Sequence, residues 1–148
     1  MELAGKHRFN QGQETVWNAL TDADVLGRCI PGCQGLKEVE ENRYDLTTKL
    51  GIGPIRGTFD GSVVLEDIQE PDHFTIKINA KGPAGFANVT IGIDLSADGD
   101  GTSVAYNGEA VVGGSVAGVG QRMLGGVAKM IADQFFKALS KEADKSAG

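Results

Sequence analysis

The sequence predicts an α+β fold in which an antiparallel sheet of six to seven strands is covered on one face by helices. Most of the chain from Leu3 to Val112 alternates apolar and polar side chains, which is the pattern of half-buried strands. From Ser115 to Lys141 the apolar residues instead recur at steps of three and four, the spacing of an amphipathic helix. A run of strands with segregated helices is typical of an antiparallel sheet with one covered face.

The elements before the closing helix follow from changes in this period. Residues 3–9 alternate with their odd positions inward, so they are expected to form the first strand. Helical periods follow at Gln13–Leu20 and Asp22–Cys29, and Pro31 with Gly32 ends the second of them. The remaining strands are expected at residues 34–41, 44–52, 55–66, 74–80, 89–95 and 104–112.

The closing helix is expected to begin at Ser115, because its hydroxyl can accept a hydrogen bond from a free amide of the first turn. Gly125 and Gly126 each cost about 1 kcal/mol inside a helix, so burial of the apolar face against the sheet must stabilise it. Residues 141–148 form a polar tail that is expected to be disordered, and residues 1–148 are expected to form one domain. The apolar face comprises Val116, Val119, Met123, Val127, Met130, Ile131 and Phe135.

The composition argues against several classes of function. The net charge is −6, whereas nucleic-acid binders carry clustered Lys and Arg. No run approaches the roughly 18 apolar residues of a membrane span, and the first residues lack a signal-peptide core, so we expect a cytoplasmic location. Cys29 and Cys33 are too few for a disulfide framework, and their spacing does not suit a zinc knuckle, so no metal site is predicted.

Motifs for catalysis or nucleotide binding are weak. The glycine-rich stretch from Gly114 to Gly120 imitates a dinucleotide-binding turn, but too little chain follows it for the parallel β-α units that hold such a cofactor. We therefore expect no cofactor. The carboxylates of the strands fall on the polar face by their phase, which argues against acid-base catalysis. These carboxylates are Asp60, Glu66, Asp94 and Glu109.

Glycines inside the strands lead to the functional hypothesis. Glycine is kept in a strand either for a bend or because another group needs the space, and from the sequence both interpretations stay open. If the missing side chains leave room, an apolar hollow would lie between the sheet and the closing helix. Such a hollow would suit an apolar molecule that carries a carbonyl or hydroxyl group. The glycines are Gly57, Gly61, Gly92 and Gly108.

The candidate lining of this hollow is mostly apolar, and each of its residues alone is more often a core residue than a ligand contact. Trp17 and Ile30 are expected near an entrance. Gln134, in the apolar stripe of the helix, is expected to bond either to a neighbour or to a ligand. Phe86 is out of phase with the strand that follows, which predicts a β-bulge near Ala87. The candidate ligand-binding residues are Trp17, Ile30, Phe59, Val63, Ile76, Phe86, Ile91, Tyr106, Met123, Val127, Ile131 and Gln134.

Several short stretches carry a resemblance to a known family. The specific ones are Cys-Ile-Pro-Gly-Cys at 29–33 and Gly-Pro-Ile-Arg-Gly at 53–57, and further ones lie at 1–5, 16–20, 84–87, 113–114, 120–122 and 133–136. In these stretches, which span nearly the whole chain, the sequence resembles the CoxG family of carbon monoxide dehydrogenase subunits, which belongs to the START-like (SRPBCC) helix-grip superfamily. The resemblance implies a curved sheet of six to seven strands that grips the C-terminal helix around a hydrophobic cavity.

The resemblance also implies a non-enzymatic accessory role beside a molybdenum-containing CO dehydrogenase-type oxidoreductase. Family members are associated with recruitment of that enzyme to the membrane and with binding of a quinone-like electron acceptor. Some members continue past the closing helix into a long linker and a membrane-binding end, whereas residues 141–148 are few and polar. We therefore expect at most peripheral contact with the inner face of the membrane.

The leading hypothesis is a module that binds a quinone- or lipid-like molecule and partners with molybdenum-hydroxylase subunits, without catalytic residues of its own. One alternative is a small cyclase or hydrolase of the same fold, which would need His7 paired with Tyr106 or Tyr44 in one cavity. Another alternative is a pure protein-interaction module with a filled interior. A pocket too small for any ligand would favour that last alternative.

Overall fold

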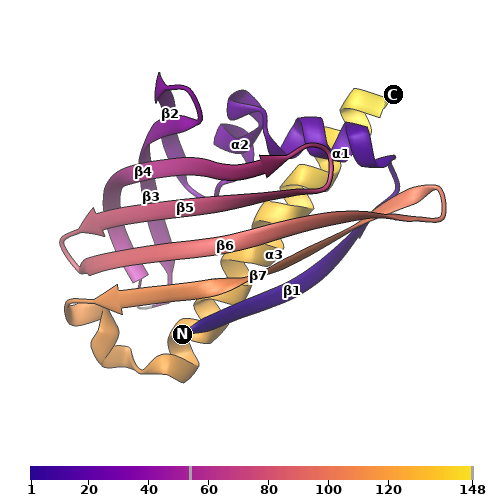
Figure 1. The fold of residues 1–148 in the computed structure, drawn as a ribbon. Coiled ribbons are helices and arrows are strands. Elements are labelled where there is room, and N and C mark those ends of the chain that lie inside the picture. The colour runs from indigo at the N-terminus through magenta and orange to yellow at the C-terminus, as the bar shows by residue number, and fades with distance from the viewer. Residues whose placement is uncertain (54, 148) are drawn as a thin grey trace.

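The structure, a computed structural model, describes residues 1–53 and 55–147, with side chains up to Lys145. It contains a sheet of seven antiparallel strands in the order β1-β7-β6-β5-β4-β3-β2, shown in Figure 1. The predicted α+β helix-grip architecture is confirmed. Pro54, part of the 53–57 motif, lies outside the described residues. The strands are β1 (Glu2–Phe9), β2 (Cys33–Glu40), β3 (Arg43–Ile52), β4 (Ile55–Gln69), β5 (His73–Gly82), β6 (Gly85–Asp98) and β7 (Gly101–Gly113).

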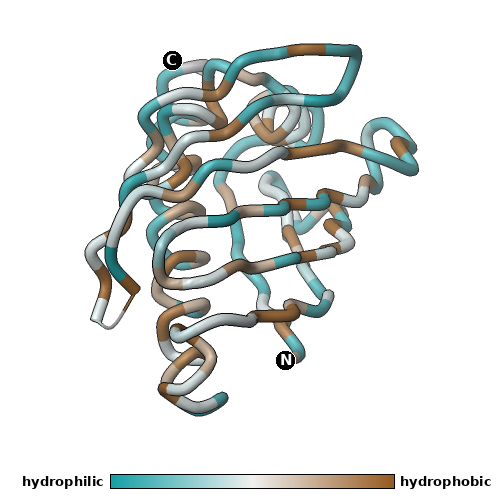
Figure 2. The backbone as a smooth tube through the Cα atoms, turned by 90° about the vertical axis from the view of Figure 1, so that its left-hand side faces the viewer, coloured by the Kyte–Doolittle hydropathy of each residue, from teal (hydrophilic) through white to brown (hydrophobic). Residues whose placement is uncertain are grey.

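The inner face of the sheet holds the residues that the alternation predicts to point inward. Tyr44 of β3 lies opposite Val63 of β4, and Ile76 of β5 lies opposite Ile91 of β6. Figure 2 shows the alternation as brown and teal segments along the strands. Because directly opposed residues point to the same side, these pairs join into one apolar surface.

The expected β-bulge near Ala87 is not formed. Strands β5 and β6 pair without a register shift from Gly82 opposite Gly85 to His73 opposite Asp94. Phe86 instead points to the outer face, where it is 40% exposed. A Cβ atom on its partner Gly113 in β7 would collide with the Phe86 ring. The ring therefore covers a glycine of the next strand, and this outward position explains why Phe86 is out of phase.

Two short helices close one end of the sheet, α1 (Gln13–Leu20) and α2 (Ala23–Cys29), and both were predicted. The carboxylate of Asp22 caps α2 by accepting hydrogen bonds from the amides of Asp24 and Val25. Each helix turns an apolar side toward the sheet. The buried side chains are Val16, Trp17, Ala19, Leu20, Val25, Leu26 and Cys29.

The closing segment consists of two helices and not one. A 3₁₀ helix, η1 (Ser115–Val119), comes before α3 (Gln121–Ala147), and Gly120 between them has a φ of 93°. Ser115 does not cap α3, since its hydroxyl donates to the carbonyl oxygen of Ala84 at 3.0 Å. The predicted start at Ser115 is wrong because a left-handed glycine separates the two helices.

Helix α3 continues through the segment that was expected to be a disordered tail. It is helical as far as Ala147, and Ala143 is fully buried. Arg28 of α2 holds this end through a two-pronged ion pair, with Nε and Nη2 at 3.0 and 3.2 Å from the two carboxylate oxygens of Glu142. Packing and this ion pair order residues whose polarity alone predicted disorder. None of the described helices has the length and apolar character that crossing a bilayer requires.

Helix α3 turns only part of the predicted face toward the sheet, where Val127, Ile131 and Phe135 are half-buried. Met123 and Met130 are 52% and 48% exposed, and Gln134 is exposed too. The 3₁₀ helix has a different period, so Val116 and Val119 do not determine the phase of α3. The buried residues of α3 show which face of the helix packs against the sheet. These are Leu124, Phe136, Leu139 and Ala143.

Candidate functional site

Two groups of buried side chains hold the helices against the sheet. The larger group lies where α1, α2 and the C-terminal half of α3 meet the strands, and it includes Phe9, Trp17 and Leu139. The smaller group lies near η1 and the start of α3. It consists of Ile55, Phe59, Val116 and Leu124. Helix α3 therefore packs firmly near both of its ends.

Between these two groups the inner surface is apolar but only half-buried. Ile78 of β5 and Val89 and Ile91 of β6 face inward, and Val127 and Ile131 lie on α3, yet all five keep partial exposure. An inward side chain is screened from the outer side by its own sheet, so its exposed part faces the space toward α3. We call these five residues the inner apolar strip. Water reaches this strip between the helix and the sheet.

The strand glycines serve both of the purposes that the sequence left open. A Cβ atom on Gly61 or Gly108 would collide with a backbone carbonyl of the neighbouring strand, so these two glycines permit close approach at bends of the sheet. A Cβ atom on Gly57 or on Gly125 of α3 would meet nothing within 4 Å. Gly57 and Gly125 therefore border open space. Gly92 lies one residue from the inward Ile91, on the outer face.

The structure brings most of the predicted lining to the inner face, but three residues lie elsewhere. Phe86, Met123 and Gln134 are exposed, Phe86 on the outer face of the sheet and the other two on α3 away from the core. Trp17 is not at an entrance, because it is 2% exposed and packs edge-to-face on Phe74. The larger buried group contains Trp17, Val63, Ile76 and Tyr106, and Ile30 and Ile91 pack against it. The smaller group contains Phe59, and Val127 packs against it. Ile131 is half-buried.

Three rings meet on the inner face where β1, β7 and α3 come together. The ring of Phe136 is 4.4 Å from that of His7 and 5.5 Å from that of Tyr106, and the His7 and Tyr106 centroids are 6.3 Å apart. The three ring planes lie within 20° of one another. The sequence identified His7 and Tyr106 as a possible pair. It did not predict Phe136, which lies against both rings, as a site residue because the predicted phase of the helix was wrong.

The environment of this cluster shifts two pKa values. Burial lowers the pKa of His7, while the carboxylate of Asp133 partly opposes this and Lys129 adds to it. The shortest distance from His7 Nε2 to an Asp133 carboxylate oxygen is 3.7 Å, too long for a hydrogen bond. Burial raises the pKa of Tyr106, and Asp133 raises it further. At neutral pH both groups are therefore uncharged.

The two cysteines differ in their surroundings. Cys29 is buried, and burial raises the pKa of its thiol to about 11. Cys33 is half-buried, and its pKa is also raised by burial. Because their pKa values are raised, these thiols are poor nucleophiles at neutral pH. Among the described residues no three His, Cys, Asp or Glu side chains come together as metal ligands.

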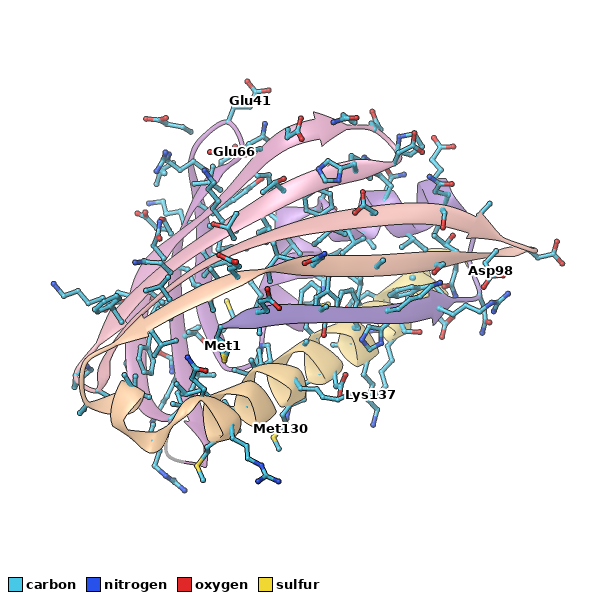
Figure 3. All side chains as sticks on the ribbon, turned by 60° about the horizontal axis from the view of Figure 1, so that its bottom comes forward. Met1, Glu41, Glu66, Asp98, Met130 and Lys137 are labelled. Atoms are coloured by element: carbon cyan, nitrogen blue, oxygen red, sulfur yellow. The ribbon has the colours of Figure 1, made fainter. Side chains whose placement is uncertain are left out.

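Two shallow hollows lie on the outer surface of the described residues. One, of about 360 Å³, follows the exposed side of α3 around Met130 and Lys137, which Figure 3 shows pointing away from the sheet. The other, of about 370 Å³, lies on the outer face of β4, β5 and β6 beside Lys81 and Phe86. Neither corresponds to the cavity expected between α3 and the sheet. The accessible apolar surface in that place is the inner apolar strip.

Comparison with known proteins agrees with this fold. A family model described as CoxG, a carbon monoxide dehydrogenase subunit, matches residues 5–144. A conserved protein from Geobacillus kaustophilus is 37% identical, with a TM-score of 0.96 over 99% of this chain and 97% of that chain. Ara h 8.0201 is 14% identical with a TM-score of 0.75 over 98% of both chains, and TTHA0849 from Thermus thermophilus is 11% identical with a TM-score of 0.74 over 100% of both. No curated protein matches the sequence.

Proposed function

Since the chain belongs to the CoxG family of carbon monoxide dehydrogenase subunits, we propose that it is a non-enzymatic accessory protein that binds an apolar small molecule for a molybdenum-containing oxidoreductase. The ligand is a quinone- or lipid-like molecule, and an isoprenoid quinone fits best. The observation that carries this proposal is the inner apolar strip, which stays partly exposed between two well-packed groups.

The strip has the physical character of a binding surface. Each Å² of apolar surface removed from water is worth roughly 25 cal/mol, so a molecule lying between Ile91 and Ile131 would be stabilised by covering both sides at once. Open space beside Gly57 and Gly125 adds room for such a molecule. Few polar groups line this space, which favours an apolar ligand with a small polar end.

Two features support a role without catalysis. The strand carboxylates Asp60, Glu66, Asp94 and Glu109 are all exposed, on the side opposite to the strip. His7 and Tyr106 lie on one face, as an enzyme of this fold would need, but neither forms a hydrogen bond with the other among the described residues. A nucleophile and its base need such contact. The paired arrangement suits recognition of a ligand better than activation of a nucleophile.

The partner is proposed from the family. The chain would deliver an electron acceptor to molybdenum-hydroxylase subunits, or recruit them to the inner face of the membrane by peripheral contact, while residing in the cytoplasm. Immobilised protein loaded with quinone should retain such subunits from a lysate of the source cells more strongly than the unloaded protein does. Equal retention with and without quinone would indicate that the chain recruits these subunits without delivering an electron acceptor to them.

Binding is tested directly with decylubiquinone and isothermal titration calorimetry. Val89→Trp places an indole in the strip and should weaken binding by about tenfold or more, whereas Thr90→Trp places it on the outer face and should leave binding unchanged. Thermal unfolding of both variants checks that they fold. A wild-type protein that binds neither decylubiquinone nor lipid recovered by solvent extraction and mass spectrometry contradicts the proposed function.

A further inference from the structure

Tyr106 carries a hydroxyl group that the protein itself does not use. The residue is only 8% exposed, yet no hydrogen bond among the described residues involves its hydroxyl oxygen. The oxygen is not sealed from solvent either, since among the described residues Gln11 Oε1 is the one fully inaccessible side-chain atom without a partner. The Tyr106 hydroxyl is therefore free and reachable inside an apolar surrounding.

The two buried threonine hydroxyl groups on the inner face have partners. Thr48 donates to the carbonyl oxygen of Pro31 at 2.7 Å, and Thr102 donates to the carbonyl oxygen of Gln11 at 2.8 Å. Buried polar groups normally form hydrogen bonds, so a hydroxyl without one on the same face is an exception that requires an explanation.

The free hydroxyl lies on the same face of the sheet as the inner apolar strip. The next inward residue of β7 after Tyr106 is Gly108, which lies opposite Ile91 of the strip. The Tyr106 ring extends over Gly5 of β1, so its hydroxyl lies about 10 Å from Ile91 across the sheet and about 7 Å from it along the strands. An elongated molecule that spans this separation can cover Ile91 and reach the Tyr106 hydroxyl.

His7 provides a second unused polar group beside Tyr106. Its ring is 6.3 Å from the Tyr106 ring, and its closest carboxylate, that of Asp133, is beyond hydrogen-bond distance at 3.7 Å. Because burial keeps the imidazole neutral near pH 7, one ring nitrogen can donate and the other can accept. Two groups of complementary character thus lie against the same ring, that of Phe136.

We propose that Tyr106 and His7 hydrogen-bond an oxygen atom at the polar end of an apolar ligand whose remaining part covers the inner apolar strip. This deepens the proposed function and rests on it. The pair selects ligands with a carbonyl or hydroxyl oxygen on a flat apolar ring over hydrocarbons of the same shape. Phe136, parallel to both rings, holds the pair in place from α3.

The test uses two probes, decylubiquinone and decylbenzene, which share the chain and an aromatic-sized ring but differ in ring oxygens. Tyr106→Phe removes the hydroxyl and keeps the ring, and Tyr44→Phe is the matched control on β3. We expect Tyr106→Phe to raise the Kd for decylubiquinone about threefold to tenfold and to leave the Kd for decylbenzene unchanged. His7→Phe should act in the same direction, and Tyr44→Phe should change neither Kd.

Infrared difference spectra measure the quinone carbonyl stretching frequency, which a purely structural effect of the substitution would not change. A hydrogen bond from Tyr106 should lower the stretching frequency of one quinone carbonyl, and Tyr106→Phe should restore the higher frequency. If decylubiquinone binds with equal affinity and an unshifted carbonyl in both proteins, the role of Tyr106 is overturned while the proposed function stands. If neither probe binds the wild type, the proposed function itself fails.

Discussion

Gly5 and Tyr106 face each other across the β1–β7 pair, so closely that a Cβ atom on Gly5 would lie 2.5 Å from the Tyr106 hydroxyl oxygen. The Tyr106 ring lies flat over the glycine, in the space that a side chain would otherwise fill. Glycine in β1 is thus what lets the ring lie beside His7 and Phe136. Such cover of a strand glycine by an aromatic ring in the next strand also restores apolar contact that glycine lacks.

Gly5→Ala should therefore destabilise the fold and disturb ligand recognition together. The new methyl group displaces the Tyr106 ring, and overpacking of this kind typically costs about 1 to 3 kcal/mol of unfolding free energy. Urea unfolding measures the cost, with Gly51→Ala as control because a Cβ atom there meets nothing within 4 Å. Similar unfolding free energies for the two variants would show that Tyr106 moves aside freely.

Gly61→Ala and Gly108→Ala should cost more than Gly5→Ala. At both positions the Cβ atom would collide with the backbone of the adjacent strand, Asn79 for Gly61 and Thr90 for Gly108, and a backbone cannot rotate away as a side chain can. We expect losses of about 3 kcal/mol or failure to fold. Yields of soluble protein and urea midpoints, compared with Gly51→Ala, check this. Stability like that of the control would mean that the sheet does not bend there.

The strands could be predicted because an alternation with a period of two is hard to mistake over six or more residues. The two short helices could be predicted because the period changes there to that of a helix. The alternation from Ile55 to Leu65 is long enough to fix which side of β4 is inward. The phase of α3 could not be predicted in the same way. Gly120 and the 3₁₀ turn before it reset the helical phase, and two exposed methionines look the same in sequence as buried ones.

The candidate site was predicted in part for the same reason. Residues on strands, such as Ile91 and Tyr106, were placed on the correct face by alternation alone. The contribution of α3 to the ring cluster, Phe136, depends on the helix phase and was missed. Partial exposure of the inner apolar strip depends on how far α3 stands from the sheet, and no local pattern encodes that separation.

The shifted pKa of His7 makes stability depend on pH. Because burial holds the folded-state pKa below the usual 6.5, the unfolded chain binds the proton more tightly than the folded one. The contribution of His7 is therefore fully present above pH 6.5 and is lost as pH falls from there toward the folded-state pKa. Urea unfolding of wild type and His7→Gln at pH 5 to 8 should show a steeper loss on acidification for wild type. Parallel curves would refute this.

Cys33 should react with iodoacetamide before Cys29. Both thiols have raised pKa values, so both should be slower than a free thiol at pH 8, but Cys33 is half-buried while Cys29 is 3% exposed with a pKa of about 11. Peptide mapping by mass spectrometry follows each site, and the guanidinium-unfolded protein sets the reference rate. Modification of Cys29 at or above the rate of Cys33 would contradict the burial of α2 against the core.

The corrected face of α3 makes opposite predictions for two of its residues. Leu139 is fully buried and Met130 is 48% exposed, although the sequence period favoured Met130 as the inward residue. Leu139→Ala should therefore lower the unfolding free energy by about 2 to 5 kcal/mol, and Met130→Ala should change it by roughly 0.5 kcal/mol or less. Because alanine is a strong helix former, both substitutions keep the helix and differ only in the contacts removed. A larger loss for Met130→Ala would return the helix to the phase read from the sequence and move Phe136 away from His7 and Tyr106.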